Sequence, residues 1–480
     1  MRILTLANTG KLDFYGKNYY SIVMKKSAQI KKVFLFLGDI AILYLSLFLT
    51  LTLRYLEIPA KTLWESHIGP FTFVFMAWIV IFYLGNLYNL SSVVNNKNFA
   101  RLTNKSVLAA ILFSLAFFYA DPNIGISPKT NLMIYVFIFY MLFILWRRSF
   151  NWLLQSYLPK ENIAIIGLDD QTKKLIKEIE NKAHLGYSIS FIINDKDEKM
   201  ENEINGIPVA NGMDGLAERI SEENIMTIVL NANPHESPEL RSMLFNCLPL
   251  KISYVSFPNF YENITGRVPI ETINQMWFLE NLSEGNKNIF DFIKRIYDLA
   301  LASLILMITL PLWPIIGIII RSESKGPVFF RQTRAGQNNK PFKILKFRTM
   351  TIADNDFAPT KENDARVTRF GSFLRKSRID EIPQAINILK GEMSFVGPRP
   401  ERPEYIEGLK TAIPFYKERM LVKPGLTGWD QISGEYHSPS REDSMKKLQY
   451  DLYYIKNRSI YLDLSIILKT ISTVLSRSGR

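Results

Sequence analysis

The amino-acid sequence predicts a multi-domain membrane protein. It would combine a four-helix transmembrane bundle, an α/β middle domain, and an α+β domain attached to the membrane by a re-entrant helix. Three observations predict this: four apolar stretches near the N-terminus, alternating strand and helix patterns from residue 162, and a fifth apolar run interrupted by prolines. We place the three parts at residues 1–150, 151–285 and 286–480.

Composition agrees with a chain that is part membrane and part soluble. The 480 residues are 48 % apolar and carry a formal net charge of +13. A positive net charge of this size is compatible with anionic lipid, phosphorylated ligands or nucleic acid as partners. The single cysteine, Cys247, excludes an internal disulfide and a zinc site made of several cysteines. The first 30 residues hold lysines and no apolar core, so we expect no cleavable signal peptide.

Four stretches match the helix of about 20 apolar residues that crosses a bilayer. They cover residues 33–53, 71–90, 106–120 and 132–146. Cations precede the first stretch, separate the second from the third and follow the fourth, so the positive-inside rule predicts a cytoplasmic N-terminus and a cytoplasmic residue 150. Asp39, inside the first stretch, is either a functional site or a hydrogen-bonding partner between helices.

The middle part alternates short β-prone runs with helical runs, which favours a parallel, Rossmann-like α/β sheet. Its first turn keeps only the first glycine, Gly167, of the dinucleotide fingerprint G-x-G-x-x-G. Asp169 and Asp170 would repel a pyrophosphate at the start of the following helix. We therefore expect a domain for regulation or assembly that does not bind NAD.

The fifth apolar run, residues 299–320, contains 22 uncharged residues and by length alone predicts a transmembrane helix. Pro311 and Pro314 lie near its middle, where each removes a helix hydrogen bond and kinks the chain. Cations flank both ends. We favour a re-entrant helix over about residues 293–320 that breaks at Pro311 and returns to the same face. A spanning helix is the alternative.

The segment SRIDEIPQAINILKGEMSFVGPRPE, residues 377–401, holds two adjacent acids, Asp380 and Glu381. They precede Pro383, which suits the first turn of a short helix that would stop at Gly391. The helix dipole and the surrounding cations would keep Asp380 ionised. An ionised carboxylate can attack phosphorus or hold a divalent cation. The simpler alternative is that the two acids only cap a helix.

Many cations lie close to these acids in the sequence. Those that we select as candidate substrate contacts upstream are Lys346, Arg348 and Arg366. They would neutralise the charge of a diphosphate and of the transition state of phosphoryl transfer. The alternative is a basic surface that faces water or lipid.

Residues 294–472 resemble the bacterial sugar transferase family, the monotopic polyprenyl-phosphate phosphoglycosyltransferases. The matching segments, in the family's order, are KRIYDLALASL, GPVFFRQTRAG, FKILKFRTM, DARVTRFGSFLRKSRIDEIPQAINILKGEMSFVGPRPE, KPGLTGWDQISG and YDLYYIKNRSIYLDLSIILKT. With its four spans and α/β domain, the whole chain looks like the family's large form. That form starts the assembly of capsule, exopolysaccharide or O-antigen.

The resemblance implies transfer of a sugar 1-phosphate from a UDP-sugar to undecaprenyl phosphate, with release of UMP. It places a phosphosugar intermediate on Asp380 and Mg²⁺ at Asp380 and Glu381. It implies further substrate contacts by Arg375 and by the Pro-Arg-Pro element, Pro398, Arg399 and Pro400. We also expect contact with membrane lipid, a homodimer, no nucleic-acid partner, and a multi-pass location in the bacterial inner membrane with the site at the cytoplasmic face.

Four positions depart from the family's pattern: Leu310, Arg378, Asp430 and Glu435. None of them belongs to the acidic pair or to Pro-Arg-Pro. Asp430 and Glu435 lie in the segment TGWDQISGEY, which we expect to shape the choice of donor, so the identity of the sugar is less defined than the chemistry. A membrane-anchored nucleotide-sugar dehydratase or epimerase would need an intact glycine fingerprint and a Tyr-x-x-x-Lys pair, which is absent from residue 150 onward. A non-enzymatic scaffold of polysaccharide export is the third alternative.

Overall fold

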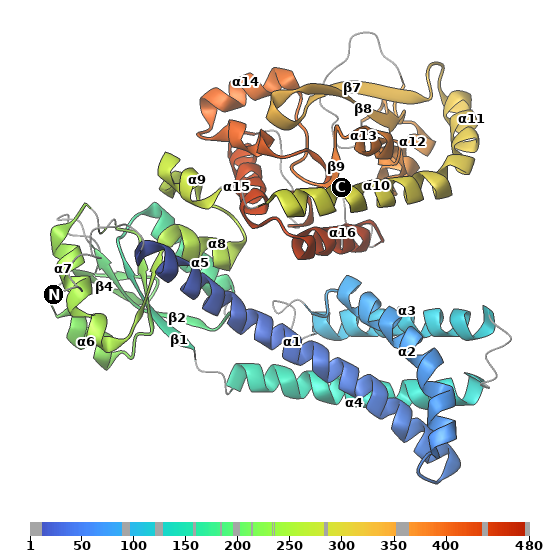
Figure 1. Cartoon of the computed structure of the whole chain (residues 1–480), viewed down its shortest axis with the longest axis horizontal. Coiled ribbons are helices and arrows are strands. Elements are labelled where there is room, and N and C mark those ends of the chain that lie inside the picture. Colours follow the sequence, from blue (N-terminus) through green and yellow to red (C-terminus); the bar gives the residue numbers. More distant parts are fainter. Residues whose placement is uncertain are drawn as a thin grey trace. The chain divides into compact units, whose positions relative to one another are not determined.

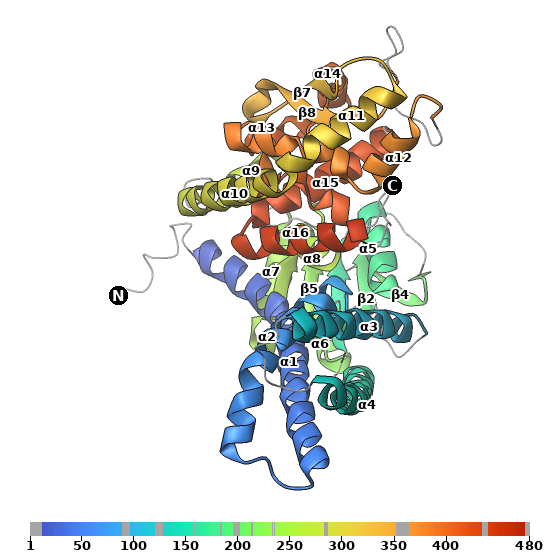
Figure 2. The same cartoon turned by 90° about the vertical axis from the view of Figure 1, so that its right-hand side faces the viewer.

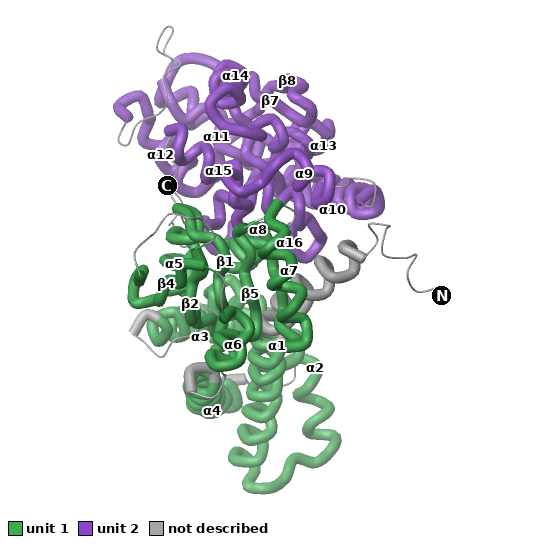
Figure 3. The backbone as a smooth tube through the Cα atoms, turned by 90° about the vertical axis from the view of Figure 1, so that its left-hand side faces the viewer, with its two compact units in different colours: residues 1–265 green, residues 266–480 purple. Residues whose placement is uncertain are grey.

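The computed structural model describes most of the chain. The described residues are 12–88, 97–120, 128–156, 160–182, 185–194, 202–212, 215–232, 234, 236–282, 287–351, 364–433 and 440–475. The chain forms two compact units, Met1–Thr265 and Gly266–Arg480, which Figure 3 shows in green and purple. We describe each unit by itself.

The first unit begins with four long apolar helices (Figure 1). They are α1 (Leu12–Tyr55), α2 (Lys61–Leu84), α3 (Lys97–Ala120) and α4 (Pro128–Ser156). Each contains a segment long and apolar enough to cross a membrane, which confirms the prediction of four apolar helices. Residues 89 and 90, at the end of the second predicted span, lie outside the described residues.

Helix α2 starts at Lys61, ten residues before the span predicted at residues 71–90. In the structure Pro70 lies inside the helix. The polar residue His67 is buried, and its Nε2 lies 3.3 Å from the Asn131 amide of α4. A buried polar side chain of this kind is compatible with a helix because a neighbouring helix supplies its hydrogen-bond partner.

Asp39 of α1 is fully buried against α4, where the Arg147 guanidinium lies 2.5 Å from its carboxylate. The Trp146 indole also donates to Asp39, and Arg147 donates to the Leu87 carbonyl. Of the two readings of Asp39, these contacts support the helix–helix partner. They also make Arg147, which the charge pattern treated as a loop cation, part of the bundle core.

The α/β part of the first unit has a six-stranded sheet in the order β3-β4-β2-β1-β5-β6. The strands are β1 (Glu161–Ile166), β2 (Tyr187–Asn194), β3 (Glu203–Ile204), β4 (Ile207–Asn211), β5 (Thr227–Leu230) and β6 (Ser253–Ser256). The α/β prediction is confirmed, and the sheet is mixed because β3 pairs with β4 in the antiparallel direction. All other pairs are parallel.

Helices cover both faces of this sheet. They are α5 (Asp170–Asn181), α6 (Leu216–Glu222), α7 (Pro238–Asn246) and α8 (Phe257–Thr265), with the short turn η3 (Leu248–Leu250). Helices α5 and α8 share one buried core with the sheet, and α6 and α7 share the other. This is the layered arrangement that strands alternating with helices predict.

The first turn of the sheet brings an acid to the start of α5. Asp169 caps this helix by accepting a hydrogen bond of 2.8 Å from the Thr172 amide. Its carboxylate therefore lies where a dinucleotide fold would bind a pyrophosphate. This contact supports the prediction that the domain does not bind NAD, and the prediction itself stays untested.

The second unit holds the remaining elements. Its helices are α9 (Gln275–Asn281), α10 (Asn288–Thr309), α11 (Trp313–Glu323), α12 (Arg369–Lys376), α13 (Gln384–Lys390), α14 (Pro403–Ala412), α15 (Arg441–Asn457) and α16 (Ile460–Leu475). Its strands are β7 (Phe329–Ala335), β8 (Pro341–Phe347), β9 (Ser394–Val396) and β10 (Gly425–Thr427). Its short turns are η4 (Ile270–Thr272), η6 (Leu310–Leu312), η7 (Gln337–Asn339), η8 (Ile379–Glu381), η9 (Tyr416–Leu421) and η10 (Asp430–Ile432).

Two small sheets organise this unit. Strands β7 and β8 form an antiparallel hairpin, and β9 pairs with β10 in the parallel direction. Val268, Ile270 and Trp277 are buried in the unit's main core, although they fall inside the predicted middle domain. The predicted boundary at residue 285 therefore differs from the division that the compact units show.

The fifth apolar run is broken where the prolines predict it. Helix α10 ends at Thr309, the turn η6 contains Pro311, and α11 begins at Trp313. The chain changes direction between α10 and α11 (Figures 1 and 2). By length and composition, Asn288–Glu323 is also a candidate membrane span.

Candidate active site

The two acids lie on the short turn η8, directly after α12. Arg378 enters this turn with a φ of 57°, a left-handed conformation that reverses the chain between the two helices. Helix α13 then ends at Gly391, whose φ of 83° favours glycine. Asp380 and Glu381 are 8 % and 7 % exposed, so this turn holds two carboxyl groups almost out of contact with water.

Three cations surround the Glu381 carboxylate. Lys346 of β8 lies 2.7 Å from Oε1, Arg399 of Pro-Arg-Pro lies 3.1 Å from the same oxygen, and Arg378 lies 3.5 Å from Oε2. Burial acts to raise the pKa of Glu381, but the three cations outweigh it and hold the pKa far below its usual range. Glu381 is therefore a permanent anion that fixes the positions of three basic side chains.

Asp380 has a different environment, although it is the next residue. Its Oδ1 is buried and has no hydrogen-bond partner among the described residues. Burial first, and then the neighbouring charge of Glu381, raise the pKa of Asp380 to about 6, against the pull of Lys346, Arg375 and Arg378. From the sequence we predicted that the surrounding cations keep Asp380 ionised. In the structure most of the direct contacts of these cations are with Glu381 and not with Asp380. Asp380 is still about nine-tenths ionised at pH 7.

The other predicted substrate contacts are not all at this centre. Arg375 donates to the Thr349 hydroxyl at 2.8 Å, and its charge acts on Asp380. Arg366 is paired with Asp364 two residues away. Arg348 is buried and donates to the backbone carbonyls of Ser324 and Lys325, at the end of α11. Lys346, Arg375 and Arg399 thus act at the acidic pair, whereas Arg348 binds the C-terminal end of α11.

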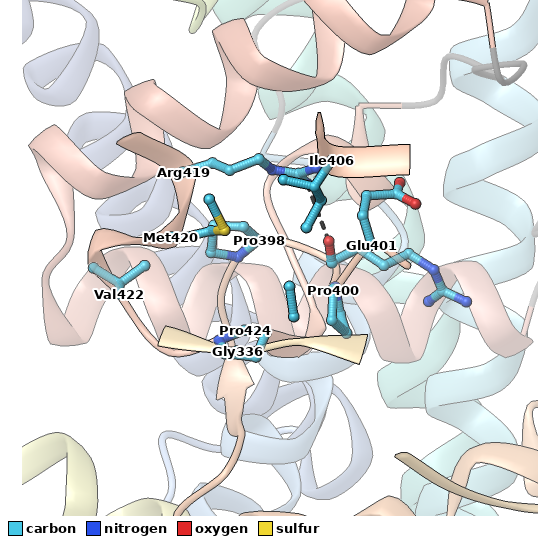
Figure 4. A pocket seen from close by; sticks show the side chains of 11 residues that line it. Gly336, Pro398, Pro400, Glu401, Ile406, Arg419, Met420, Val422 and Pro424 are labelled. Atoms are coloured by element: carbon cyan, nitrogen blue, oxygen red, sulfur yellow. Dashed lines mark hydrogen bonds between the residues drawn. The ribbon is translucent and has the colours of Figure 1, made fainter. Parts of the chain in front are cut away.

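The Pro-Arg-Pro element leads out of β9 beside a small, partly open hollow (Figure 4). Arg399 and the two flanking prolines line this hollow, together with Arg419 and Met420 of η9. The exposed fraction of the Arg399 side chain is 43 %, so its guanidinium can reach both Glu381 and a ligand. Sequence reasoning did not select Arg419, because nothing near it in the sequence marks it.

The four departures from the family's pattern fall in different places. Leu310 begins η6 and is half exposed, and Asp430 begins η10. Arg378 contacts Glu381, so this departure adds a cation to the acidic pair. Glu435 lies outside the described residues.

A divalent cation fits this centre through Asp380. Magnesium in phosphoryl-transfer sites uses one or two carboxylates together with substrate phosphates. The buried, unpartnered Oδ1 of Asp380 is such a ligand. Among the described residues no group of three or more His, Cys, Asp or Glu side chains could hold a metal by itself. Both oxygens of Glu381 are already used by cations, which leaves Asp380 as the available ligand.

The fold and this centre define a membrane protein with a carboxylate and cation site suited to phosphorylated substrates. A family model described as bacterial sugar transferase matches residues 289–477, and one described as a CoA-binding domain matches residues 85–255. UDP-glucose:undecaprenyl-phosphate glucose-1-phosphate transferase of Escherichia coli (strain K12) is 30 % identical over 325 residues, 67 % of this chain and 69 % of the relative. The chain belongs to the bacterial sugar transferase family.

Two other relatives give the same picture. UDP-glucose:undecaprenyl-phosphate glucose-1-phosphate transferase of Xanthomonas campestris pv. campestris is 31 % identical, over 66 % of this chain and 67 % of its own length. UDP-N-acetylgalactosamine-undecaprenyl-phosphate N-acetylgalactosaminephosphotransferase of Aeromonas hydrophila is 38 % identical over 50 % of this chain. The match spans 56 % of the Aeromonas protein. The predicted family is therefore confirmed.

Proposed function

We propose that this protein transfers a sugar 1-phosphate from a UDP-sugar to undecaprenyl phosphate and releases UMP. This is the first membrane step in making capsule, exopolysaccharide or O-antigen. The observation that carries the proposal is the acidic pair, in which Glu381 binds three cations while the Asp380 oxygen remains without a partner. The names of the relatives make glucose and N-acetylgalactosamine the first sugars to test.

In this mechanism Asp380 is the nucleophile. Its carboxylate oxygen attacks the sugar-bearing phosphorus of the donor, and the bond from that phosphorus to the bridging oxygen breaks, so UMP leaves with the bridging oxygen. A phosphate oxygen of undecaprenyl phosphate then attacks the same phosphorus and restores the carboxylate. Glu381 keeps Arg399 and Lys346 beside the reacting phosphate, where their charges stabilise the transition state. A bound Mg²⁺ would neutralise the donor's diphosphate.

We further propose that α10 and α11 form a re-entrant membrane segment. Arg295 of α10 donates to the carbonyls of Ile388 and Leu389, while Glu323 at the end of α11 accepts from the Phe370 amide. Both ends of the segment are therefore tied to the same folded unit. A straight helix of 36 residues would separate its ends by about 54 Å.

The break exposes an apolar surface that suits a lipid environment. Met307, Ile308 and Ile318 are each at least 63 % exposed. We place this segment in the cytoplasmic leaflet of the bacterial inner membrane, where the headgroup of a polyprenyl phosphate and a water-soluble nucleotide sugar can meet. We also retain the homodimer and the regulatory or assembly role of the α/β domain as parts of the proposal.

The proposal is tested with a panel of UDP-sugars, undecaprenyl phosphate and membranes that contain this chain. We expect UMP release with one or a few of the donors, and loss of this release in both Asp380→Asn and Glu381→Gln. Full turnover by either variant would remove the pair from the mechanism. If wild-type membranes released no UMP from any UDP-sugar, the proposed donor class would be wrong.

A further inference from the structure

The Pro-Arg-Pro segment is held by its backbone carbonyls. Its two prolines have no backbone N–H, so the segment cannot use a normal ladder of strand hydrogen bonds. Instead, four consecutive carbonyl oxygens each accept one hydrogen bond. The pairs are Pro398 with the Gly425 amide (2.9 Å), Arg399 with Arg419 Nη2 (3.0 Å), Pro400 with Arg334 Nη1 (3.1 Å) and Glu401 with the Ala335 amide (2.9 Å).

Arg419, on η9, is the more deeply buried of the two arginines. One end of its guanidinium lies 2.8 Å from the carboxylate of Asp451, on α15, and the other donates to the Tyr416 hydroxyl at 2.6 Å. Arg419 and Asp451 are 6 % and 2 % exposed. The planar guanidinium can bind an acid, a hydroxyl and the Arg399 carbonyl together, which a lysine could not do. Figure 4 shows Arg419 reaching the segment that carries Pro398 and Pro400.

Arg334 holds the next carbonyl from the hairpin β7–β8. Its Nη2 donates to the Gln332 side-chain oxygen at 2.8 Å, and the Glu401 carboxylate lies 3.9 Å from its Nη1. Arg334 and Arg419 therefore approach neighbouring carbonyls from two different elements of the same unit. Both of these hydrogen bonds go to backbone carbonyls, which any residue would offer. The two arginines therefore fix the path of the backbone and not the identity of its side chains.

We propose that Arg419 and Arg334 are positioning residues, which hold the Pro-Arg-Pro backbone so that the Arg399 side chain reaches Glu381 and the donor phosphate. This inference rests on the proposed function. Arg399 is the link, because its carbonyl binds Arg419 and its guanidinium lies 3.1 Å from Glu381. A shift of about 1 Å in this backbone would withdraw one of the three cations of the acidic pair.

The test is a double-mutant cycle on UMP release. Arg419→Gln, Arg399→Gln and the double variant are compared with the wild type at equal amounts of folded protein. We expect Arg419→Gln to lower kcat/KM on the order of 10- to 100-fold, with the same division between kcat and KM as Arg399→Gln. In the Arg399→Gln background it should cost almost nothing further. Arg419→Lys should not restore the rate, because lysine lacks the planar fork.

Equal losses from Arg419→Gln in both backgrounds would overturn the inference, and so would wild-type kinetics. Lys417→Gln is the matched control, because it removes an exposed cation of the same turn and should leave kcat/KM unchanged. If Arg419→Gln does not fold, the same cycle with Arg334→Gln decides the question. A wild type without turnover would refute the proposed function, whereas turnover with additive losses would refute only the positioning role.

Discussion

The proton affinity of Asp380 gives the sharpest prediction for this site. Its pKa of about 6 lies roughly two units above that of an ordinary aspartate, which corresponds to about 3 kcal/mol against the charged form. Only the ionised carboxylate can attack phosphorus. Lowering the pH through 6 therefore protonates the Asp380 carboxylate, and kcat/KM should fall about tenfold between pH 7 and pH 5.

The assay is UMP release at low donor concentration across this pH range, at several fixed magnesium concentrations. Because a proton and the metal would compete for the same carboxylate, more magnesium should move the acid limb to lower pH. Arg378→Gln removes a cation that favours ionised Asp380, so its acid limb should move to higher pH. Arg331→Gln, which removes an exposed cation of β7, is the matched control. A value of kcat/KM that does not change with pH down to 5 would refute this account of Asp380. So would an acid limb at the same pH in Arg378→Gln and in the wild type.

Two further predictions concern the membrane parts. The buried Cys247 is first replaced by serine, and the variants Asn288→Cys and Lys340→Cys are then made one at a time. Both cysteines should be labelled from the same, cytoplasmic side of sealed vesicles. Labelling from opposite sides would show that α10 and α11 cross the membrane. Asp39→Asn should destabilise the bundle by about 3–5 kcal/mol, measured as a lower thermal midpoint in detergent, because it leaves Arg147 buried without a counter-charge. Replacing both residues by leucine and methionine should recover most of this loss, and an equally unstable double variant would contradict the pairing.

Local patterns in the sequence predicted the features that depend on neighbouring residues. Apolar length predicted the four helices, Pro311 predicted the break after α10, and Gly391 predicted the end of α13. The turn that carries Asp380 and Glu381 lies directly before that helix, as expected. Each of these follows from backbone chemistry within a few residues.

The destinations of the cations could not be predicted in this way. Lys346 and Arg348 are two residues apart, yet Lys346 contacts Glu381 and Arg348 binds carbonyls at the end of α11. Strand β8 ends at Phe347, between them, so the alternation of strand side chains no longer relates the two. Arg419 was missed for a similar reason, because its partners Asp451 and Arg399 are brought to it only by the folded chain.

The bond from Arg295 to the last carbonyls of α13 has a practical consequence for anyone who wants a soluble version of this enzyme. The proposed membrane segment also binds the far end of α13, the helix that begins just after Asp380. Deleting the chain up to Glu323 would remove the apolar segment. It would also remove the hydrogen bonds from Arg295 that hold the far end of α13, the helix that follows the acidic pair. A soluble version would instead need polar substitutions of the exposed apolar side chains of α10 and α11, with Arg295 left in place.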